Sequence, residues 1–367
     1  MKRKILVLEP YYGGSHKLFL DGLSSNIKGE FTFMTLPARK WKMRMQLAAL
    51  WFACKIQELP LEKRKFDLVL CSTFVDVAVL RSQLSKYQWW DNQTLFHVYF
   101  HENQFSYPGQ TPDPQRNQFT SINFTSAVAA DFLAFNSRFN LDSFLAGING
   151  YLKKAADMSF AGLIESLKNK SMVIYPGLDF SLIDKYRARS TADAKGPVII
   201  WNHRWEHDKD PECFFSTLYK LSAKKIPFQL IVLGQSFRNQ PACFSEARQR
   251  LAQHILHFGY VNAKQEYASL LRQGDIVIST ARHEFFGISV IEAVRAGCFP
   301  LLPDRLAYPE LFGGEYLYQE GKLLKRLTEC ISRLDGLDKK TTAKLTDRFQ
   351  WTCLKKEYEK WLFVDTV

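Results

Sequence analysis

A strand–loop–helix–strand pattern in the last third of the sequence most restricts the fold of this chain. The apolar runs 275–280 and 298–302 predict two buried strands, and residues 288–296 between them predict a helix. Gly287 stands where the loop turns into the helix, and Gly297 stands where a left-handed residue ends it. This order of elements is typical of an α/β protein with a parallel sheet.

Two glutamates accompany the predicted helix. Glu284 lies just before it, and Glu292 lies within it among apolar neighbours. The start of a helix directs unpaired N–H groups and a positive dipole end at a ligand. A carboxylate in an apolar turn needs a partner, and the hydroxyl groups of a sugar or ribose can donate to it. A surface glutamate pair on an amphipathic helix fits the same spacing equally well.

Length and charge restrict the domain organisation and the partners. A chain of 367 residues is long enough for two domains with separate cores. Lys and Arg outnumber Asp and Glu by 49 to 37, which gives a formal net charge of +12. This excess favours an anionic partner such as nucleic acid, an acidic membrane or a phosphorylated substrate. A basic surface that only confers solubility is the alternative.

The cysteines and the apolar runs exclude several classes of protein. Seven cysteines are scattered along the chain without a Cys-x2-Cys pair, so neither a zinc knuckle nor a disulfide framework is indicated. The first apolar run, residues 5–8, is too short for a signal peptide, and no run reaches membrane-spanning length. We therefore expect a reduced, cytoplasmic protein without stable membrane insertion.

Polar residues follow two predicted strands of the first half, at the sheet edge where α/β proteins bind ligands. Strand 5–8 precedes Gly14 and Ser15, and paired glycines there permit close approach of the backbone to a ligand, although a tight structural turn would also use them. The loop lacks the G-x-G-x-x-G pattern, which argues against a nicotinamide cofactor. Strand 94–100 ends before His101, and a His in that position followed by polar residues indicates function. The residues that follow it are Glu102, Asn103 and Gln104.

Cations and a tryptophan lie together after the predicted strand 31–36. Arg39, Trp41 and Arg44 suggest a site for phosphates and a stacked base, or else a solvated loop that leads into a helix. The apolar run 47–56 that follows is expected to pack as a helix. A Pro- and Gly-rich loop at 105–118 suggests an acceptor-binding or lid element, or plain irregular structure.

The second half begins with a further candidate site. The predicted strand 198–202 ends at Asn202, and Arg204 and Lys209 occupy the loop before a helix that begins at Pro211. An Arg and a Lys in one such loop can bind a diphosphate, Arg through its planar fork and Lys as a point charge. Exposed surface charge is the alternative interpretation.

Taken together, these elements resemble the retaining glycosyltransferases of the GT4 type. Glu284 and Glu292 are separated by seven residues, which resembles the signature of that family. Asn136-Ser137 and the segment 172–179 resemble two further elements in the family's order. The resemblance implies the GT-B fold: two doubly wound, Rossmann-like α/β domains that face each other across a cleft. It implies an acceptor-binding domain at 1–190, a nucleotide-sugar-binding domain at 191–345, and a helix at 346–367 that packs back on the first domain.

The resemblance also implies roles for individual residues. Glu284 would contact the donor sugar, Glu292 the nucleotide ribose, and Arg204 and Lys209 the diphosphate, while His101 would touch the reacting sugar. The implied catalytic residues are His101, Arg204, Lys209 and Glu284. The implied donor-binding residues are Gly14, Asn202, Gly287, Ile288, Ser289 and Glu292. The expected acceptor-binding residues are Ser15, Arg39, Trp41, Arg44, Glu102, Asn103 and Gln104. The absence of an Asp-x-Asp element at a strand end, together with the resemblance, implies no metal and no cofactor.

Three segments resemble one subgroup, the tRNA-queuosine α-mannosyltransferases. They are Glu9 to His16, His101 to Gln104 and Trp201 to Lys209. This subgroup transfers mannose from GDP-mannose onto queuosine in a tRNA anticodon, and the basic excess fits a tRNA acceptor. Two alternatives remain open: a GT4 enzyme acting on a membrane glycolipid, and a non-catalytic nucleotide- or RNA-binding protein on the same fold.

Overall fold

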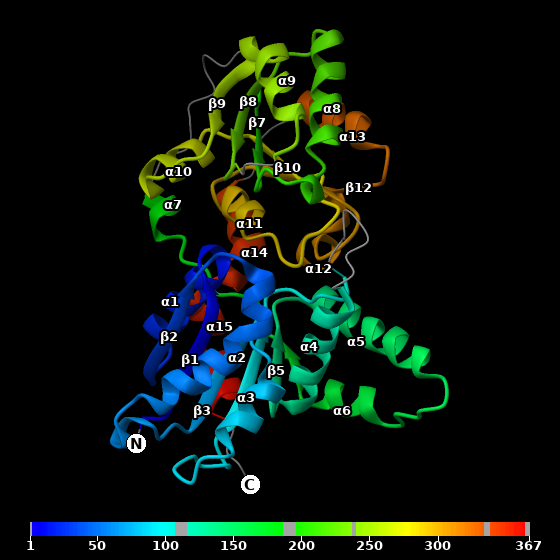
Figure 1. The fold of residues 1–367 in the computed structure, drawn as a ribbon. Helices are drawn as coiled ribbons and strands as arrows, with labels where there is room; N and C mark the ends of the chain where they lie inside the picture. Colours follow the sequence, from blue (N-terminus) through cyan, green and yellow to red (C-terminus); the bar gives the residue numbers. More distant parts are fainter. Residues whose placement is uncertain (1, 107–115, 186–195, 237–239, 334–337, 364–367) are drawn as a thin grey trace. The chain divides into compact units, whose positions relative to one another are not determined.

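The computed structural model of the chain describes residues 2–106, 116–185, 196–236, 240–333 and 338–363. These residues form two compact units. The first combines the residues up to 178 with those from 351 onward, and the second comprises residues 179–350 (Figure 1). The predicted domain boundary between residues 190 and 191 lies outside the described residues.

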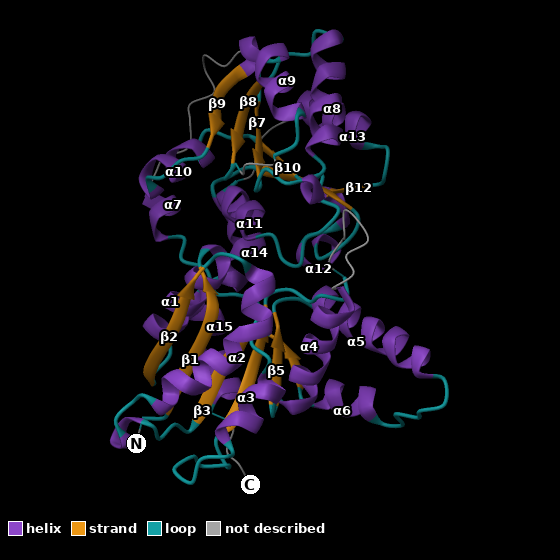
Figure 2. Cartoon of the chain, viewed as in Figure 1, coloured by secondary structure: helices purple, strands orange, loops and turns teal. Residues whose placement is uncertain are grey.

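The first unit is built on a six-stranded parallel sheet with the strand order β2-β1-β3-β4-β5-β6. The strands are β1 (Lys4–Tyr12), β2 (Glu30–Pro37), β3 (Leu68–Ser72), β4 (Leu95–Phe100), β5 (Phe132–Phe135) and β6 (Ser171–Val173). The helices between them are α1 (Gly14–Asn26), α2 (Trp41–Gln57), α3 (Val77–Leu84), α4 (Arg116–Ala129), α5 (Arg138–Leu152) and α6 (Leu163–Asn169). Strands and helices alternate along the chain, which confirms the predicted α/β class (Figure 2).

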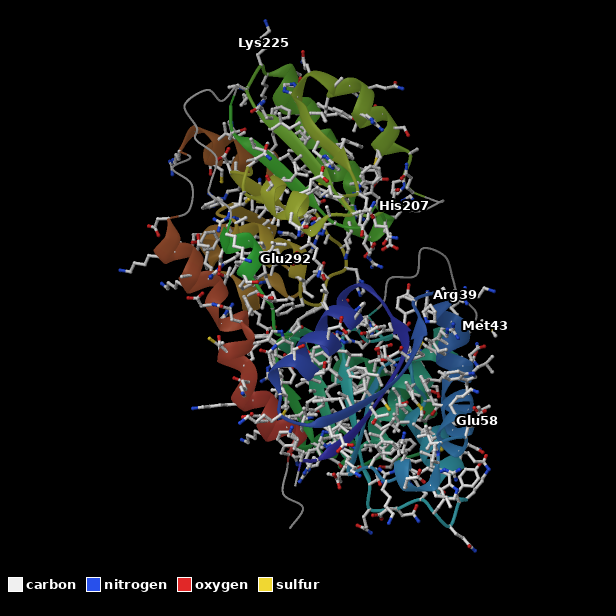
Figure 3. All side chains as sticks on the ribbon, turned by 90° about the vertical axis from the view of Figure 1, so that its left-hand side faces the viewer. Arg39, Met43, Glu58, His207, Lys225 and Glu292 are labelled. Carbon is white, nitrogen blue, oxygen red and sulfur yellow. The ribbon has the colours of Figure 1, made fainter. Side chains whose placement is uncertain are left out.

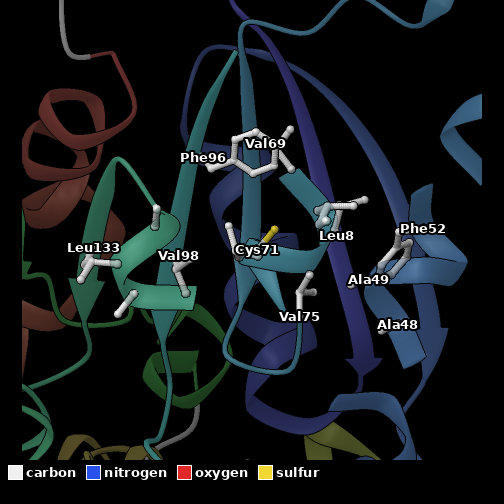
Figure 4. Close-up of a cluster of buried hydrophobic side chains, with 14 of the residues drawn as sticks. Leu8, Ala48, Ala49, Phe52, Val69, Cys71, Val75, Phe96, Val98 and Leu133 are labelled. Carbon is white, nitrogen blue, oxygen red and sulfur yellow. The ribbon is translucent and has the colours of Figure 1, made fainter. Parts of the chain in front are cut away.

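Both faces of this sheet are buried. Leu6 and Leu8 of β1 belong to a core that includes Phe52 of α2, and Figure 4 shows part of this cluster. Ile5 and Val7 belong to a second core on the opposite face, because successive side chains of a strand point to opposite sides. A parallel sheet covered on both faces accounts for the nearly continuous apolar runs of its strands.

The last helix, α15 (Trp351–Leu362), packs on the first unit. Its aromatic residues join the core that contains Ile5 and Val7. The Tyr358 hydroxyl donates to the Tyr175 carbonyl at 2.7 Å. A Cβ atom on Gly22 or Gly177 would overlap the Trp351 indole, so both glycines are needed for this close packing.

The second unit contains another six-stranded parallel sheet, with the order β12-β11-β10-β7-β8-β9. Its strands are β7 (Val198–Asn202), β8 (Gln229–Leu233), β9 (Ile255–Gly259), β10 (Ile276–Ile278), β11 (Phe299–Pro303) and β12 (Leu317–Tyr318). Its helices are α7 (Ser181–Lys185), α8 (Pro211–Ala223), α9 (Cys243–Arg250), α10 (Lys264–Leu271), α11 (Ile288–Arg295), α12 (Tyr308–Leu311), α13 (Leu323–Ser332) and α14 (Lys339–Thr346). Asn202 therefore ends β7, and a helix begins at Pro211, as predicted.

Two local predictions for the first unit need correction. The predicted strand 5–8 is too short, because β1 continues to Tyr12 and pairs with β2 beyond Leu8. Trp41 does not lie in a loop: it is the first residue of α2, preceded by Lys40 in a left-handed conformation. The run 47–56 packs as a helix, as expected, with Ala48, Ala49 and Phe52 buried.

The next three observations on the described residues concern membrane helices, metal sites and disulfides. Among the described residues, no helix is both long and apolar enough to cross a membrane. Within the same residues, no group of three or more His, Cys, Asp or Glu side chains is arranged to hold a metal ion. All seven cysteines lie in the described part of the chain, and none forms a disulfide.

Candidate functional site

In the second unit, the loops after β7 and β10 form a cluster of charged residues at one edge of the sheet. Strands β7 and β10 are parallel neighbours, so their carboxyl ends open at the same edge, where α/β sheets bind ligands. The loop after β7 contributes Asp208 and Lys209, and the loop after β10 contributes His283 and Glu284. The Thr280 hydroxyl donates to the Lys209 carbonyl at 2.8 Å and ties the two loops together.

Lys209 is the buried cation of this cluster, with 6% of its surface exposed. Its Nζ donates to the His283 carbonyl at 2.5 Å and lies 3.1 Å from Asp208 Oδ2 and 3.4 Å from Glu284 Oε2. Burial alone would lower the pKa of Lys209, but the Glu284 and Asp208 carboxylates outweigh it and raise the pKa. Lys209 is therefore a fixed positive charge at neutral pH.

Glu284 carries the complementary negative charge. Burial alone would raise the pKa of its carboxyl group, but the Lys209 ammonium, with smaller contributions from His203, His283 and the Phe286 N–H, lowers it. Its side chain keeps 19% exposure, so it borders the surface of the cluster. The structure thus brings together the predicted residues Lys209 and Glu284.

Arg204 occupies a different environment from Lys209. Its side chain is about half exposed, and its guanidinium lies 3.0 Å from Glu206 Oε2. The two cations predicted to bind one diphosphate therefore differ in exposure: Lys209 is buried between carboxylates, whereas the side chain of Arg204 is about half exposed.

The beginning of α11 is attached directly to the end of β7. Gly287 precedes the helix with φ of 91°, a left-handed conformation that favours glycine. The Ser289 hydroxyl donates to the Asn202 carbonyl at 2.6 Å, and the Asn202 side-chain amide donates to the Ser289 carbonyl at 3.1 Å. Ile288 is the first helical residue, so the predicted donor-binding segment 287–289 forms the start of the helix.

Glu292 lies one turn further along α11 and has a partner that the sequence did not reveal. The Tyr267 hydroxyl donates to Glu292 Oε2 at 2.7 Å and accepts from the Asn202 amide at 2.8 Å. Burial raises the pKa of Glu292, and the hydrogen bond from Tyr267 opposes that effect. Tyr267 belongs to α10, and no motif in the sequence connects it with α11.

In the first unit, His101 follows β4 at the carboxyl edge of the sheet. It is 8% exposed, and its ring centroid lies 4.1 Å from that of His16 and 4.9 Å from that of Phe19. Burial, together with the neighbouring His16, holds the pKa of His101 well below its usual value. His101 is therefore a neutral imidazole at physiological pH.

Glu102 lies beside His101 with 18% of its side chain exposed. Its Oε2 lies 3.4 Å from His16 Nε2, and its Oε1 accepts a hydrogen bond from the Thr73 hydroxyl at 3.1 Å. Gly14 and Ser15, at the start of α1, are both exposed. His16 and its second partner, Glu9, were not assigned from the sequence, although a carboxylate next to an apolar strand was a visible signal.

Asn103 and Gln104 are buried, and the contacts they make stabilise the loop. The Asn103 amide donates to Asn140 Oδ1 at 2.8 Å, and its carbonyl oxygen accepts from the Ser106 N–H at 3.0 Å. The backbone N–H of Gln104 donates to Asn123 Oδ1 at 2.9 Å. These contacts assign Asn103 a structural part in shaping the loop, which differs from its expected contact with the acceptor.

The predicted aromatic and basic group near the start of α2 is divided between interior and surface. Trp41 is half-buried, with its ring centroid 5.1 Å from that of Phe119. Arg39 is exposed at the surface, as Figure 3 shows. Arg44 is half-buried, and its Nε makes no hydrogen bond within the described residues. Most of the predicted loop 105–118 lies outside the described residues.

Two protein families and a relative of known name match this chain. Residues 4–178 match the family described as tRNA-queuosine alpha-mannosyltransferase N-terminal, and residues 183–324 match glycosyl transferases group 1. The chain is 32% identical to the tRNA-queuosine alpha-mannosyltransferase of Drosophila melanogaster over 95% of this chain and 92% of that protein.

Two further comparisons concern part of the chain and the fold. The GDP-mannose:cellobiosyl-diphosphopolyprenol alpha-mannosyltransferase of Xanthomonas campestris is 27% identical over 36% of this chain and 34% of its own length. The crystal structure of Anabaena HepE in complex with UDP-glucose has a TM-score of 0.71 at 15% identity, covering 98% of this chain and 99% of that chain. Two Rossmann-like units and such structural neighbours confirm the predicted GT-B fold. This chain matches the Drosophila protein over nearly its whole length, and residues 4–178 match the N-terminal family of the same enzymes. The chain therefore belongs to the tRNA-queuosine α-mannosyltransferase family.

Proposed function

We propose that this chain transfers mannose from GDP-mannose, with retention of the α configuration, onto queuosine in a tRNA anticodon. Its family and the name of its Drosophila relative support the reaction and the acceptor. The name of its Xanthomonas relative supports GDP-mannose as the donor. The observation that carries the proposal is the cluster of Lys209 and Glu284 beside the start of α11.

The second unit would bind the nucleotide sugar. The Glu284 carboxylate accepts hydrogen bonds from sugar hydroxyls, and Glu292 accepts them from the ribose. The unpaired N–H groups at the start of α11 attract the diphosphate, and Arg204 and Lys209 add positive charge. When the bond between the anomeric carbon and the diphosphate oxygen breaks, negative charge grows on the diphosphate. Fixed cations and oriented N–H groups stabilise that charge without rearrangement.

The first unit would bind the acceptor. A formal net charge of +12 favours association with the phosphates of tRNA. The exposed Arg39 and the partly exposed Glu102 supply a phosphate contact and a hydroxyl contact. The acceptor oxygen forms the new bond to the anomeric carbon, and its proton passes to the departing diphosphate. His101, as a neutral imidazole, orients the sugar by hydrogen bonding.

The experiment compares donors and tRNAs directly. The protein is incubated with GDP-mannose, UDP-glucose or UDP-galactose and with tRNA that contains or lacks queuosine, and the digested nucleosides are weighed by mass spectrometry. We expect the mass of one hexose to be added to queuosine when GDP-mannose is the donor and not with either UDP-sugar. An α-mannosidase is expected to release that hexose. Transfer from a different donor, or no transfer to queuosine, would overturn the proposal.

One observation favours a second candidate, a glycosyltransferase with a membrane glycolipid as acceptor. Met43, Leu47, Leu50 and Trp51 form an exposed apolar face on α2, each with 38–51% of its surface exposed. Figure 3 shows Met43 at the surface near Arg39. An apolar helix face with nearby cations is typical of binding to anionic membranes. Flotation with anionic liposomes, compared with a tRNA gel shift over the same salt series, separates the two acceptors.

A further inference from the structure

Three ionisable side chains of the first unit are linked from the interior of the sheet toward its surface. Glu9 in β1 is 1% exposed, and its Oε1 accepts hydrogen bonds from the Tyr11 N–H at 2.7 Å and the Ser72 hydroxyl at 3.1 Å. Its Oε2 lies 2.9 Å from His16 Nδ1. His16 Nε2 in turn faces Glu102 Oε2 at 3.4 Å. We call these three residues the Glu9–His16–Glu102 relay.

Ring packing and one hydroxyl hold the relay in place. Phe74 lies parallel to the His16 ring, with 5.3 Å between centroids and 10° between planes. His101 contacts His16 with a centroid distance of 4.1 Å. The Thr73 hydroxyl donates to Glu102 Oε1 at 3.1 Å, and His16 Nε2 lies 3.4 Å from Glu102 Oε2, so both oxygens of Glu102 have a partner. The direction of the Glu102 carboxylate therefore depends on His16.

The charge of His16 depends on both of its carboxylate neighbours. Burial alone would lower the pKa of His16, but Glu9 and Glu102 together raise it to about 10. The relay thus contains an imidazolium between two carboxylates at neutral pH. A positive neighbour favours the ionised form of a carboxyl group, so His16 keeps Glu102 as a carboxylate.

Two titratable groups beside the relay, His101 and Cys71, have shifted pKa values that keep them neutral at physiological pH. His101, which follows β4, is kept neutral by burial and by His16. Burial also raises the pKa of the Cys71 thiol in β3, which lies near Glu9. The Tyr11 ring of β1 lies edge-on to His16, with 6.2 Å between centroids. Among these neighbours, Glu9 and Glu102 are the groups that raise the pKa of His16.

We propose that Glu102 accepts a hydrogen bond from the acceptor hydroxyl, and that Glu9 and His16 are positioning residues that fix its charge and direction. This inference rests on the proposed function, because it assigns Glu102 to the acceptor of that transfer. A carboxylate that accepts the O–H hydrogen bond turns an oxygen lone pair toward the anomeric carbon. Glu102 orients the hydroxyl, and its proton still passes to the departing diphosphate, so Glu102 is not protonated in the step.

The test uses Glu9→Gln, which removes one charge from the interior end of the relay and retains the size of the side chain. His16 then keeps only Glu102 as a charged partner, and its pKa falls toward neutrality. GDP-mannose is kept saturating and the concentration of queuosine-containing tRNA is varied. For Glu9→Gln, we expect kcat/KM for tRNA to fall about tenfold between pH 6 and pH 9. The wild-type protein is expected to show a flat profile over that range. Hydrolysis of GDP-mannose without tRNA is expected to stay unchanged in the variant.

His254→Gln is the matched control, because it removes a partly buried histidine of the second unit that contacts Phe228 and Ser222. It is expected to keep the wild-type pH profile. A wild-type profile in Glu9→Gln would overturn the inference, as would an equal loss of donor hydrolysis and tRNA transfer, which indicates a purely structural role. If Glu9→Gln does not fold, the partly exposed Glu102→Gln takes its place: a raised KM for tRNA supports the inference, and unchanged acceptor kinetics overturn it.

The two proposals fail in different ways. If the proposed function is wrong, the wild-type protein transfers no mannose to queuosine-containing tRNA. If only the relay is wrong, the wild-type protein is active and Glu9→Gln matches it at every pH.

Discussion

Each unit places one buried cation between two carboxylates at the carboxyl edge of a six-stranded parallel sheet. In the first unit His16 lies between Glu9 and Glu102, and in the second Lys209 lies between Asp208 and Glu284. Burying a charge without a partner would be costly, so each buried cation is paired with carboxylates.

The difference lies in the cation itself. A lysine is charged at neutral pH without help, because its ordinary pKa is about 10.4. A buried histidine would be neutral, and His16 is charged because two carboxylates raise its pKa to about 10. Lys209 of the second unit is therefore charged at neutral pH by its own chemistry. His16 of the first unit is charged at neutral pH because of its carboxylate neighbours.

The largest expected effect tests the permanent charge. Lys209→Met removes the cation that faces Glu284, and we expect turnover to fall by about 10²–10³ because the departing diphosphate loses one fixed stabilising group. The measurement is kcat with both substrates saturating. Lys220→Met, at an exposed position of α8, is the control and is expected to leave turnover unchanged. Unchanged turnover in Lys209→Met would remove Lys209 from the mechanism.

An intermediate effect concerns stability against pH, and two histidines should respond in opposite directions. The folded-state pKa of His16 is raised to about 10, so its stabilisation is complete below pH 6.5 and is lost as the pH rises toward 10. Burial lowers the pKa of His203 to about 4, so its contribution is complete above pH 6.5 and is lost as the pH falls toward 4.

Thermal unfolding followed by circular dichroism checks both directions. The difference in Tm between wild type and His16→Gln should shrink from pH 6.5 to pH 9.5, and that between wild type and His203→Gln should shrink from pH 6.5 to pH 4.5. About 1 kcal/mol corresponds to roughly 2–4 °C for a unit of this size. Differences that do not change with pH would contradict the assigned charge states.

The smallest expected effect tests the neutral contact beside the second cluster. Tyr267→Phe removes one hydrogen bond to Glu292 and leaves the packing of α10 and α11 intact. We expect KM for GDP-mannose to rise about three- to tenfold, with kcat nearly unchanged, because Glu292 remains available to the ribose. A loss of kcat as large as that of Lys209→Met would mean that Tyr267 acts on the reacting groups.

Local sequence patterns predicted the elements that carry these sites. Strands β10 and β11 and helix α11 occur where apolar runs and two glycines indicated them. Gly297 has φ of 112°, the left-handed conformation predicted for the residue that ends the helix, and Gly287, at the predicted turn into the helix, is also left-handed with φ of 91°. Glu284 lies before the helix and Glu292 lies inside it, as the strand–loop–helix pattern predicted.

Partners that are distant in the sequence were not predicted. The sequence indicated that Lys209 binds a diphosphate, and the structure also places its ammonium 3.4 Å from Glu284, which belongs to a distant loop. Asn103 was expected to contact an acceptor, but its amide binds Asn140, which follows the next strand of the sheet. In both cases the missing information was which loops meet at the sheet edge.

The sequence by itself determined the order of strands and helices, the left-handed glycines and the family, because these depend on preferences and motifs within short segments. Only the tertiary structure decided that Glu9, His16 and Glu102 form one relay and that Tyr267 supports Glu292. The physical reason is that charge state and hydrogen bonding depend on distances through space. Those distances are set by the strand order of each sheet, which no short segment of the chain contains.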